Sequence, residues 1–275
     1  METKLSFVIL TWNSEATIDA CLTSIEDSCS RENIPYEVFI VDNGSRDGTC
    51  SIIERFGTMP IRLTCHTKNR GTTTTRNEAL RMCTGEVVCI LDSDASFVEG
   101  SLRELMAKLL ADRSIGILAP KLIERDGKVQ ASVKKFPSVV GKIARIPRIL
   151  FKMNMADAGI YPDFPFDDVR EVDCAISACW FFRRSLLDDV GFLDERIFYA
   201  PEDVDFCLRV RKTGKKLVYD PAVTVLHQTQ QITHKRVLSK VALSHFFGLM
   251  YYFIKHRYVT SPSIPHAEQP ADRDG

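Results

Sequence analysis

Short runs of apolar residues recur along the chain and are separated by segments with a different spacing. Three of the runs are almost continuously apolar, which is typical of strands buried on both faces of a parallel sheet. They are residues 5–10 (LSFVIL), 36–42 (YEVFIVD) and 87–91 (VVCIL). Residues 60–66 (PIRLTCH) are a further candidate strand. We expect these runs to lie in one sheet.

The segments between the runs have the spacing of helices. Apolar residues recur every three or four positions at Ile18, Cys21, Leu22 and Ile25, with Asn13 or Ser14 as the expected helix cap. Residues 69–83 form a second helical segment before the strand at 87–91. This alternation predicts an α/β fold with a mostly parallel central sheet, flanked by helices, in a single domain.

Polar side chains follow three of the predicted strands. Residues 11–13 follow the first strand, Asp42 ends the second, and Asp92 and Asp94 follow residues 87–91. In an open α/β sheet, ligands bind at the edge where the carboxyl ends of the strands meet. Two nearby carboxylates repel each other unless a cation or a ligand compensates their charge. The pattern therefore indicates a ligand site that attracts positive charge.

Composition and charge narrow the class of protein. The chain has 275 residues, of which 45% are hydrophobic and 26% charged, and its 36 basic residues balance 36 acidic ones. This balance argues against a nucleic-acid binder that relies on overall charge. Nine cysteines without a C-x-x-C pair indicate neither a disulfide framework nor a zinc cluster. Without the pattern of a membrane span or a signal peptide, we expect a cytoplasmic protein.

The second half of the chain is less regular. Residues 121–133 predict a hairpin. Residues 222–227 (AVTVLH) alternate, so that the two valines share one face of a strand with His227. Residues 261–275 are polar and rich in proline and are predicted to be disordered.

Six segments, taken in order, resemble the family-2 glycosyltransferases of the GT-A fold, in particular the branch with bacterial rhamnosyltransferases and galactofuranosyltransferases. They are VILTWNS, VDNGSRDGT, NRGTTTTRNEAL, GEVVCILDSDA, FLDERIFYAPEDVDFCLRVRKTG and VTVLH. A D-x-D triplet alone is a weak signal, whereas the ordered set is strong. The resemblance implies a GT-A domain at residues 1–230, with a nucleotide-sugar-binding half at 1–120 and an acceptor and catalytic half at 121–230.

The resemblance implies a nucleotide-diphosphate sugar as the donor. Thr11, Trp12 and Asp42 would contact its nucleobase or ribose, and Arg76 would lie near its diphosphate. The full set of expected donor-binding residues is Thr11, Trp12, Asn13, Asp42, Asn69, Gly71, Arg76, Asp92, Ser93 and Asp94. The run at residues 72–75, TTTT, departs from the family pattern, and β-branched residues are poor helix formers at a helix start.

A divalent cation suits the carboxylates of the D-x-D triplet. Sugar transfer leaves negative charge on the departing diphosphate, which a cation stabilises. Magnesium and manganese prefer oxygen ligands, and Asp94 is placed to supply one, while Asp92 is nearer to a ribose hydroxyl. The resemblance matches His227 to a position that can ligate the metal, and imidazole is an acceptable ligand for manganese. The alternatives are a polar turn at residues 92–96 and a structural histidine.

The acceptor hydroxyl requires a base, and the segment YAPEDVDF offers three carboxylates. Pro201 suits the first position of a helix. By spacing, Asp203 shares the apolar face of this helix, whereas Asp205 pairs with Arg209 on the expected outer face. A helix amino terminus favours the charged form, so Asp203 is the candidate catalytic base. Glu202 is explained adequately as an acidic residue of a first helical turn.

The resemblance also matches one strand to the acceptor-side wall of the family. The residues are Asp173, Ser177, Cys179 and Trp180. The alternative is an ordinary buried strand with a packed tryptophan.

Two stretches of the second half contain basic residues and no acid, at residues 127–156 and 221–267. The second surrounds the apolar run FFGLMYYFI with Lys235, Arg236, Lys240, Lys255 and Arg257. Residues 231–260 are therefore expected to form an amphipathic helical extension that binds an anionic membrane surface. The alternative is a helix docked on the core or on another subunit.

Residues and resemblance together predict an inverting glycosyltransferase that depends on Mn²⁺ or Mg²⁺. The acceptor would be a glycan or a lipid-linked glycan, with the protein peripheral at the inner face of the cell membrane. Direct in-line displacement is expected because the base would lie on one side of the anomeric carbon and the metal-bound diphosphate on the other, so that no nucleophilic side chain is needed. The alternatives are a non-catalytic nucleotide-sugar-binding protein and a sugar-phosphate nucleotidyltransferase. The latter is disfavoured because no glycine-rich, basic signature follows the first strand.

Overall fold

The computed structural model describes residues 4–144, 159, 161, 163–228, 240–260 and 262. Within these residues the chain forms a nine-stranded sheet and a small two-stranded one. The strands of the large sheet are β1 (Leu5–Thr11), β2 (Tyr36–Asp42), β3 (Ile61–Cys65), β4 (Val87–Asp92), β5 (Ala95–Glu99), β6 (Ile115–Ile123), β8 (Arg170–Val172), β10 (Cys179–Arg183) and β11 (Lys216–His227). The small sheet pairs β7 (Val133–Lys134) with β9 (Cys174–Ala175).

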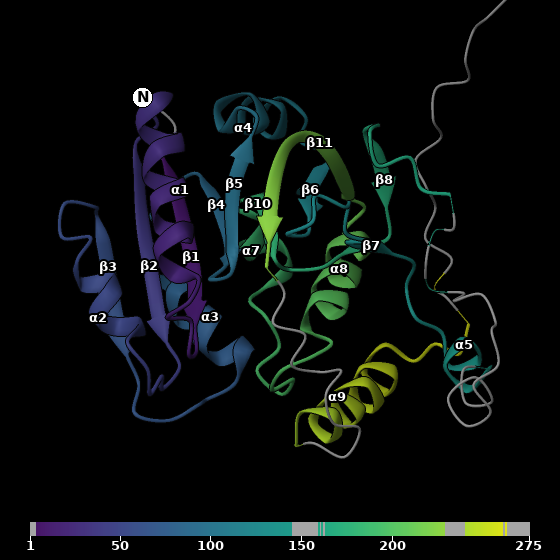
Figure 1. Ribbon diagram of the computed structural model, residues 1–275. Coiled ribbons are helices and arrows are strands. Elements are labelled where there is room, and N and C mark those ends of the chain that lie inside the picture. The colour runs from purple at the N-terminus through teal and green to yellow at the C-terminus, as the bar shows by residue number, and fades with distance from the viewer. Residues whose placement is uncertain are drawn as a thin grey trace, which may run out of the picture.

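Helices follow most of the strands in the chain. They are α1 (Ile18–Arg31), α2 (Thr49–Glu54), α3 (Thr72–Met82), α4 (Leu102–Ala111), α5 (Val139–Ala144), α7 (Leu186–Val190), α8 (Glu202–Lys212) and α9 (Lys240–His256). The alternation in the first half follows the predicted order of strands and helices (Figure 1).

The order of strands in the large sheet is β3-β2-β1-β4-β10-β6-β11-β5, with β8 beside β11. Strands β1 to β4 pair in parallel, and β6 is parallel to β11. β10 is antiparallel to both β4 and β6, so β11 runs in the same direction as β4. The predicted α/β class with a mostly parallel sheet is confirmed. The carboxyl ends of β1, β2, β4 and β11 consequently meet at one edge.

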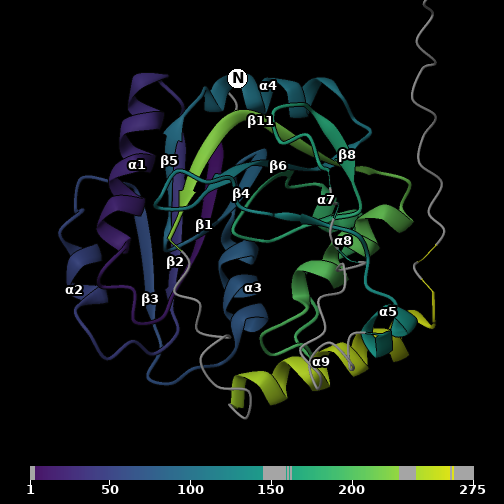
Figure 2. The same cartoon turned by 45° about the vertical axis from the view of Figure 1, so that its right-hand side comes forward.

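Apolar side chains cover both faces of this sheet. Phe7 and Ile9 of β1 belong to a buried cluster with residues of α1 and α4. Val8, which points the other way, belongs to a second cluster with residues of α3, α8 and α9. The continuous apolar runs seen in the sequence thus reflect helices packed on both sides of the sheet (Figure 2).

Helix α1 begins later than expected. Thr17 precedes the first helical residue, and neither Asn13 nor Ser14 is the cap. The Ser14 carbonyl instead accepts hydrogen bonds from the amides of Thr17 and Ile18, and its hydroxyl accepts one from the Trp12 amide. The residues after β1 therefore form a loop at the carboxyl edge of the sheet before the helix begins.

The threonine run at the start of α3 is helical despite its low propensity. Thr73 Oγ1 donates to the Ile197 carbonyl, and Thr75 Oγ1 donates to the Gly71 carbonyl, both at 2.7 Å. These two side chains are fully buried. Their hydrogen bonds offset the poor helix propensity of β-branched residues. The departure from the family pattern thus leaves the helix intact.

Helix α9 occupies part of the expected carboxyl-terminal extension. Residues 231–239, which include Lys235 and Arg236, lie outside the described residues, as do 145–158 and the tail at 263–275. None of the helices in the described ranges is long and apolar enough to cross a membrane. In Figures 1 and 2, α9 lies at the end of the molecule toward which the arrowheads of β2 and β11 point.

Candidate active site

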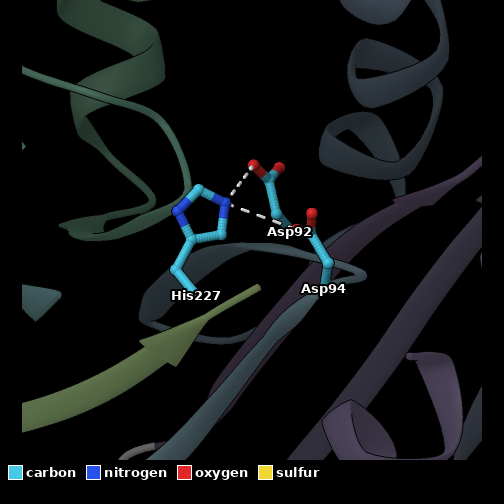
Figure 3. Close-up of side chains that lie close together, drawn as sticks. All are labelled: Asp92, Asp94 and His227. Carbon is cyan, nitrogen blue, oxygen red and sulfur yellow. Dashed lines mark ion pairs between the residues drawn. The ribbon is translucent and has the colours of Figure 1, made fainter. Parts of the chain in front are cut away.

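Asp92, Asp94 and His227 converge at the carboxyl edge of the sheet (Figure 3). Their ligand atoms all lie within 4.8 Å of one another. His227 Nε2 is 3.4 Å from Asp94 Oδ1 and 3.8 Å from Asp92 Oδ2. Strand pairing brings the histidine there, because β11 pairs with β5, which starts directly after the D-x-D triplet, and places His227 opposite Ala95. The Gln228 amide also donates to the Asp94 carbonyl at 2.8 Å.

The tautomer of His227 is set by Gln130. Gln130 Oε1 lies 2.8 Å from His227 Nδ1. An amide oxygen only accepts hydrogen bonds, so Nδ1 carries the hydrogen and Nε2 is turned toward the carboxylates. Burial lowers the pKa of His227, but the hydrogen bond to Asp94 and the charges of both aspartates outweigh it and raise the pKa. The cluster therefore favours positive charge at Nε2, either as a proton or as a cation.

The donor atoms of this cluster fit a divalent cation. Carboxylate oxygens are the ligands that Mg²⁺ and Mn²⁺ prefer. A histidine whose other nitrogen is fixed by a hydrogen bond is the usual form of a metal-binding imidazole. Asp94 and His227 are the two residues that were expected to hold the metal, and in the structure Asp92 lies close enough to join them.

Arg76 joins the D-x-D triplet to α8. Its buried guanidinium donates from Nη1 to Ser177 Oγ at 2.7 Å and to Glu202 Oε1 at 3.4 Å, and from Nη2 to Asp92 Oδ1. Burial is the largest effect on Asp92 and, with the like charge of Asp94, raises its pKa despite the lowering effects of Arg76 and His227. Arg76 is thus engaged with protein groups, and its expected place near the diphosphate stays a prediction.

Helix α8 presents two acidic residues at its amino terminus. Pro201 stands before the first helical residue, one position earlier than expected. Glu202 is buried, whereas Asp203 is partly exposed, with Oδ1 accepting from the Val204 amide at 2.8 Å. Burial and the charge of Asp203 raise the pKa of Glu202 to about 8, against the lowering effect of Arg76. The partly exposed Asp203 is therefore the more accessible carboxylate.

The expected outer face of α8 is covered by α9. Asp205 pairs with Arg209 at 2.9 Å, as predicted, but its side chain is fully buried. Lys255 Nζ and His256 Nε2 of α9 lie 2.6 Å and 2.8 Å from Asp205 Oδ1. The expectation of an outer face at Asp205 is wrong, because spacing within one helix does not report a second helix that packs on it.

Thr11, Asn13 and Asp42 tie the ends of β1 and β2 together. Thr11 Oγ1 donates to Asp42 Oδ1 at 2.8 Å, and two backbone amides of the following turn donate to Asp42 Oδ2. Asn13 Oδ1 accepts from the Arg46 amide at 2.9 Å. Asp42 is thereby buried in its own turn, whereas Trp12 is 41% exposed on the neighbouring loop. Of these residues, Trp12 has the surface on which a nucleobase could stack.

Asn69, Gly71 and Ser93 belong to the loops around the same edge. Asn69 Oδ1 accepts from the Gly71 amide at 2.9 Å. Gly71 has φ of 91°, and a Cβ atom there would lie 2.6 Å from the Phe198 carbonyl oxygen. Only glycine permits this conformation and this approach. Ser93 Oγ lies 2.8 Å from Ser14 Oγ, and donor contacts by all three expected residues stay predictions.

Two residues of the site were missed or underrated by sequence reasoning. Gln130 lies on the return arm of the hairpin predicted at residues 121–133, where its amide donates to the Leu122 carbonyl, but no sequence pattern links its side chain to His227. Glu202 had a signal, since it adjoins Asp203 in the matching segment, but its contact with Arg76 requires the folded chain. Of the residues expected in the acceptor-side wall, Ser177 accepts a hydrogen bond from Arg76. Trp180, in contrast, is fully buried and stacks on a phenylalanine of α8.

A mostly parallel sheet with a D-x-D triplet at its carboxyl edge is the arrangement of a GT-A glycosyltransferase. The chain belongs to glycosyl transferase family 2, because residues 6–191 match the sequence model of that family. It lies in the rhamnosyltransferase-like branch. It is 27% identical over 252 residues to the N-acetylglucosaminyl-diphospho-decaprenol L-rhamnosyltransferase of Mycobacterium tuberculosis, covering 88% of this chain and 81% of that relative.

Two solved structures share the fold. One is a mannosyltransferase from Pyrobaculum calidifontis in complex with GDP-Man and Mn²⁺. It has a TM-score of 0.61 at 20% identity, and the match covers 95% of this chain and 66% of the mannosyltransferase chain. GalNAc-T7 with UDP, GalNAc and Mn²⁺ has a TM-score of 0.64 at 14% identity and covers 87% of this chain and 46% of its own. At these identities the similarity supports the GT-A fold alone.

Proposed function

We propose that this protein transfers a sugar from a nucleotide-diphosphate sugar to a hydroxyl of a lipid-linked glycan, with inversion at the anomeric carbon. The convergence of Asp92, Asp94 and His227 at the sheet edge carries this proposal. Arg76 links this cluster to the amino terminus of α8, where Asp203 lies. Both solved neighbours contain Mn²⁺ and either a nucleotide or a nucleotide sugar at a similar fold.

Asp94 and His227 would hold the cation, Mn²⁺ or Mg²⁺, with Asp92 beside them. The bound cation supplies positive charge that stabilises the departing nucleotide diphosphate. Gln130 keeps His227 Nε2 directed at the site. Trp12 offers its exposed ring to the nucleobase, and the remaining donor-binding residues shape the loops around it.

Asp203 acts as the general base in this proposal. The acceptor hydroxyl oxygen attacks the anomeric carbon while the bond from that carbon to the diphosphate oxygen breaks, and the hydroxyl proton passes to the Asp203 carboxylate. The helix amino terminus and the Val204 amide favour the charged form that accepts this proton. Attack on the side opposite to the leaving group inverts the configuration.

The mycobacterial relative supports a lipid-linked acceptor. Its name describes transfer of L-rhamnose to N-acetylglucosaminyl-diphospho-decaprenol. We infer an acceptor sugar on a polyprenyl diphosphate and a peripheral position at the inner face of the cytoplasmic membrane. Residues 1–120 would bind the donor and residues 121–230 the acceptor.

The test is a screen of nucleotide sugars, including nucleotide-activated L-rhamnose, with a short-chain prenyl diphospho-N-acetylglucosamine and Mn²⁺. Release of nucleoside diphosphate and an NMR assignment of the product anomer are measured, with Asp203→Asn as control. Acceptor-dependent release with inversion is expected. A product with retained configuration would contradict the mechanism, and donor binding without any turnover would favour the non-catalytic alternative.

A further inference from the structure

Helix α9 has two faces of different character. One face is apolar and exposed, and its residues follow helical spacing: Phe246 at 55%, Phe247 at 61%, Met250 at 48% and Ile254 at 68% exposure. The opposite face is docked, with Tyr252 fully buried in the cluster that also contains residues of α8. We call the first set the open face, and we call the residues that contact the rest of the protein the docked face: Gly248, Tyr251, Tyr252, Lys255 and His256.

The docked face holds both ends of the segment that carries the candidate base. At one end, Tyr251 Oη and Lys255 Nζ each donate to Asp194 Oδ2 at 2.8 Å. At the other end, Lys255 and His256 contact the buried Asp205. The residues between these two anchors include Glu202 and the candidate base.

Gly248 lets α9 come close to the start of α8. A Cβ atom at this position would overlap the Ala200 carbonyl oxygen and lie 3.2 Å from Pro201 Cδ. A larger residue therefore displaces either α9 or the peptide just before Glu202. The glycine is needed here for close packing of two backbones.

The same segment also supports α3. The Phe198 carbonyl accepts from the Thr72 amide, and the Ile197 carbonyl accepts from Thr73 Oγ1, both at 2.7 Å. Helix α3 carries Arg76, whose guanidinium holds Asp92 and Glu202. A shift of α9 would thus displace residues 194–205. It would thereby move the start of α8, which carries Asp203, and the start of α3, which carries Arg76.

We propose that α9 couples membrane binding to the geometry of the active site. Its open face enters the headgroup region of an anionic bilayer, while its docked face fixes residues 194–205. This inference rests on the proposed function, which places a lipid-linked acceptor at the membrane.

Three observations favour a lipid surface as the partner of the open face. The sequence from residue 221 to 267 contains no acid, and Arg257 is exposed directly after the helix. An apolar helix face next to an exposed basic residue, in a stretch without acid, suits the interface of anionic lipid. In Figures 1 and 2, α9 lies at the end of the molecule toward which β2 and β11 point, which is the side of the donor edge.

The first test is co-sedimentation with phosphatidylglycerol-containing and pure phosphatidylcholine vesicles at low and high salt. The open-face variant is Phe247→Glu with Ile254→Glu, and the control is Val98→Glu, at an apolar position of β5 with 56% exposure. We expect the open-face variant to lose about tenfold or more in affinity for the anionic vesicles, and the control to bind like the unchanged protein. Unchanged binding by the open-face variant would overturn the assignment. So would a concentration-dependent dimer abolished by this variant, which would make a second copy the partner.

The second test is hydrogen exchange of residues 194–205 with and without anionic vesicles. We expect vesicles to slow exchange there in the unchanged protein. In Gly248→Leu, and in Lys255→Met as a milder docked-face variant, vesicles should still bind but no longer slow it. Exchange that does not respond to bound vesicles in the unchanged protein would overturn the coupling. Neither test measures sugar transfer, so a failure of the proposed function is recognised separately.

Discussion

The Nδ1 atom of His227 donates a hydrogen bond to Oε1 of Gln130 at 2.8 Å. This contact decides which ring nitrogen faces Asp92 and Asp94. A partner that fixes the orientation of a metal-binding histidine usually matters nearly as much as the ligands themselves. We therefore expect Gln130 and His227 to act as a unit in cation binding.

Replacement of Gln130 by leucine should weaken Mn²⁺ binding by a factor of about 10–100, because the ring loses its fixed tautomer and orientation. Isothermal titration calorimetry of Mn²⁺, with a nucleoside diphosphate present, measures the change. The matched control is Gln228→Leu, next to His227 in the chain, which among the described residues removes side-chain hydrogen bonds to Arg125. Equal Mn²⁺ affinities of the two variants would show that Gln130 does not orient the ligand.

Binding of nucleoside diphosphates should require a divalent cation. The negative diphosphate would otherwise approach two carboxylates without compensation. A chelator should abolish binding in calorimetry. Asp94→Ala should weaken binding about tenfold or more, since losing a metal ligand should lower metal affinity at least as much as losing a residue that orients a ligand. If affinity is the same with and without the chelator, the metal assignment is wrong.

The local pattern of the sequence was sufficient to predict the strands that meet at the carboxyl edge of the sheet. Val87 to Leu91 are apolar without interruption because helices cover both faces of the sheet. The alternation at residues 222–227 placed His227 on the same face as two buried valines, which the structure bears out. The position of a strand and the face on which each of its side chains lies depend on residues close together in the sequence, so the periodicity of apolar residues predicts them.

The residues that escaped prediction depend on contacts between distant segments. Asp205 was assigned to an outer face because its own helix offers no sign of Lys255 and His256, which come from α9. Gln130 is close to His227 because β11 pairs in parallel with β6 and because the chain after β6 turns back on it, so that the Gln130 amide donates to the Leu122 carbonyl. Pairing between strands far apart in sequence is not encoded in the spacing of either one.

Removal of the buried Asp205 carboxylate should destabilise the fold. Asp205→Ala removes the buried partner of Arg209 and one of the two carboxylates that contact Lys255, and breaking such a buried network costs about 3–5 kcal/mol. Urea denaturation measures the free energy of unfolding. The control Asp27→Ala, at an exposed position of α1, should change it by less than about 0.5 kcal/mol. A loss no larger than that of the control would mean that α9 does not depend on this anchor.

The raised pKa of Glu202 makes stability depend on pH. Its pKa is about 8 in the folded protein against 4.5 as the ordinary value, so the folded state holds the proton more tightly than the unfolded chain. The resulting stabilisation is complete below pH 4.5 and is lost as the pH rises toward 8. Between these limits the melting temperature of the unchanged protein, measured with a chelator, should fall more than that of Glu202→Gln. Parallel curves would mean that Glu202 is charged in the folded state.

Asp203→Asn should lower turnover by a factor of about 100 or more while leaving donor affinity nearly intact, since a general base contributes on that scale. Donor affinity is expected to survive because the cluster of Asp92, Asp94 and His227 and the ring of Trp12 do not depend on the Asp203 charge. Glu202→Gln is the matched control on the adjacent residue. Because the Glu202 pKa is about 8, this residue is largely protonated at neutral pH, and an amide replaces the neutral form with little loss of turnover.

The measurement is kcat and KM of both variants with the donor and acceptor found by screening. If Glu202→Gln were the more damaging variant, the base would be the buried carboxylate that contacts Arg76, and the assignment of Asp203 would be wrong.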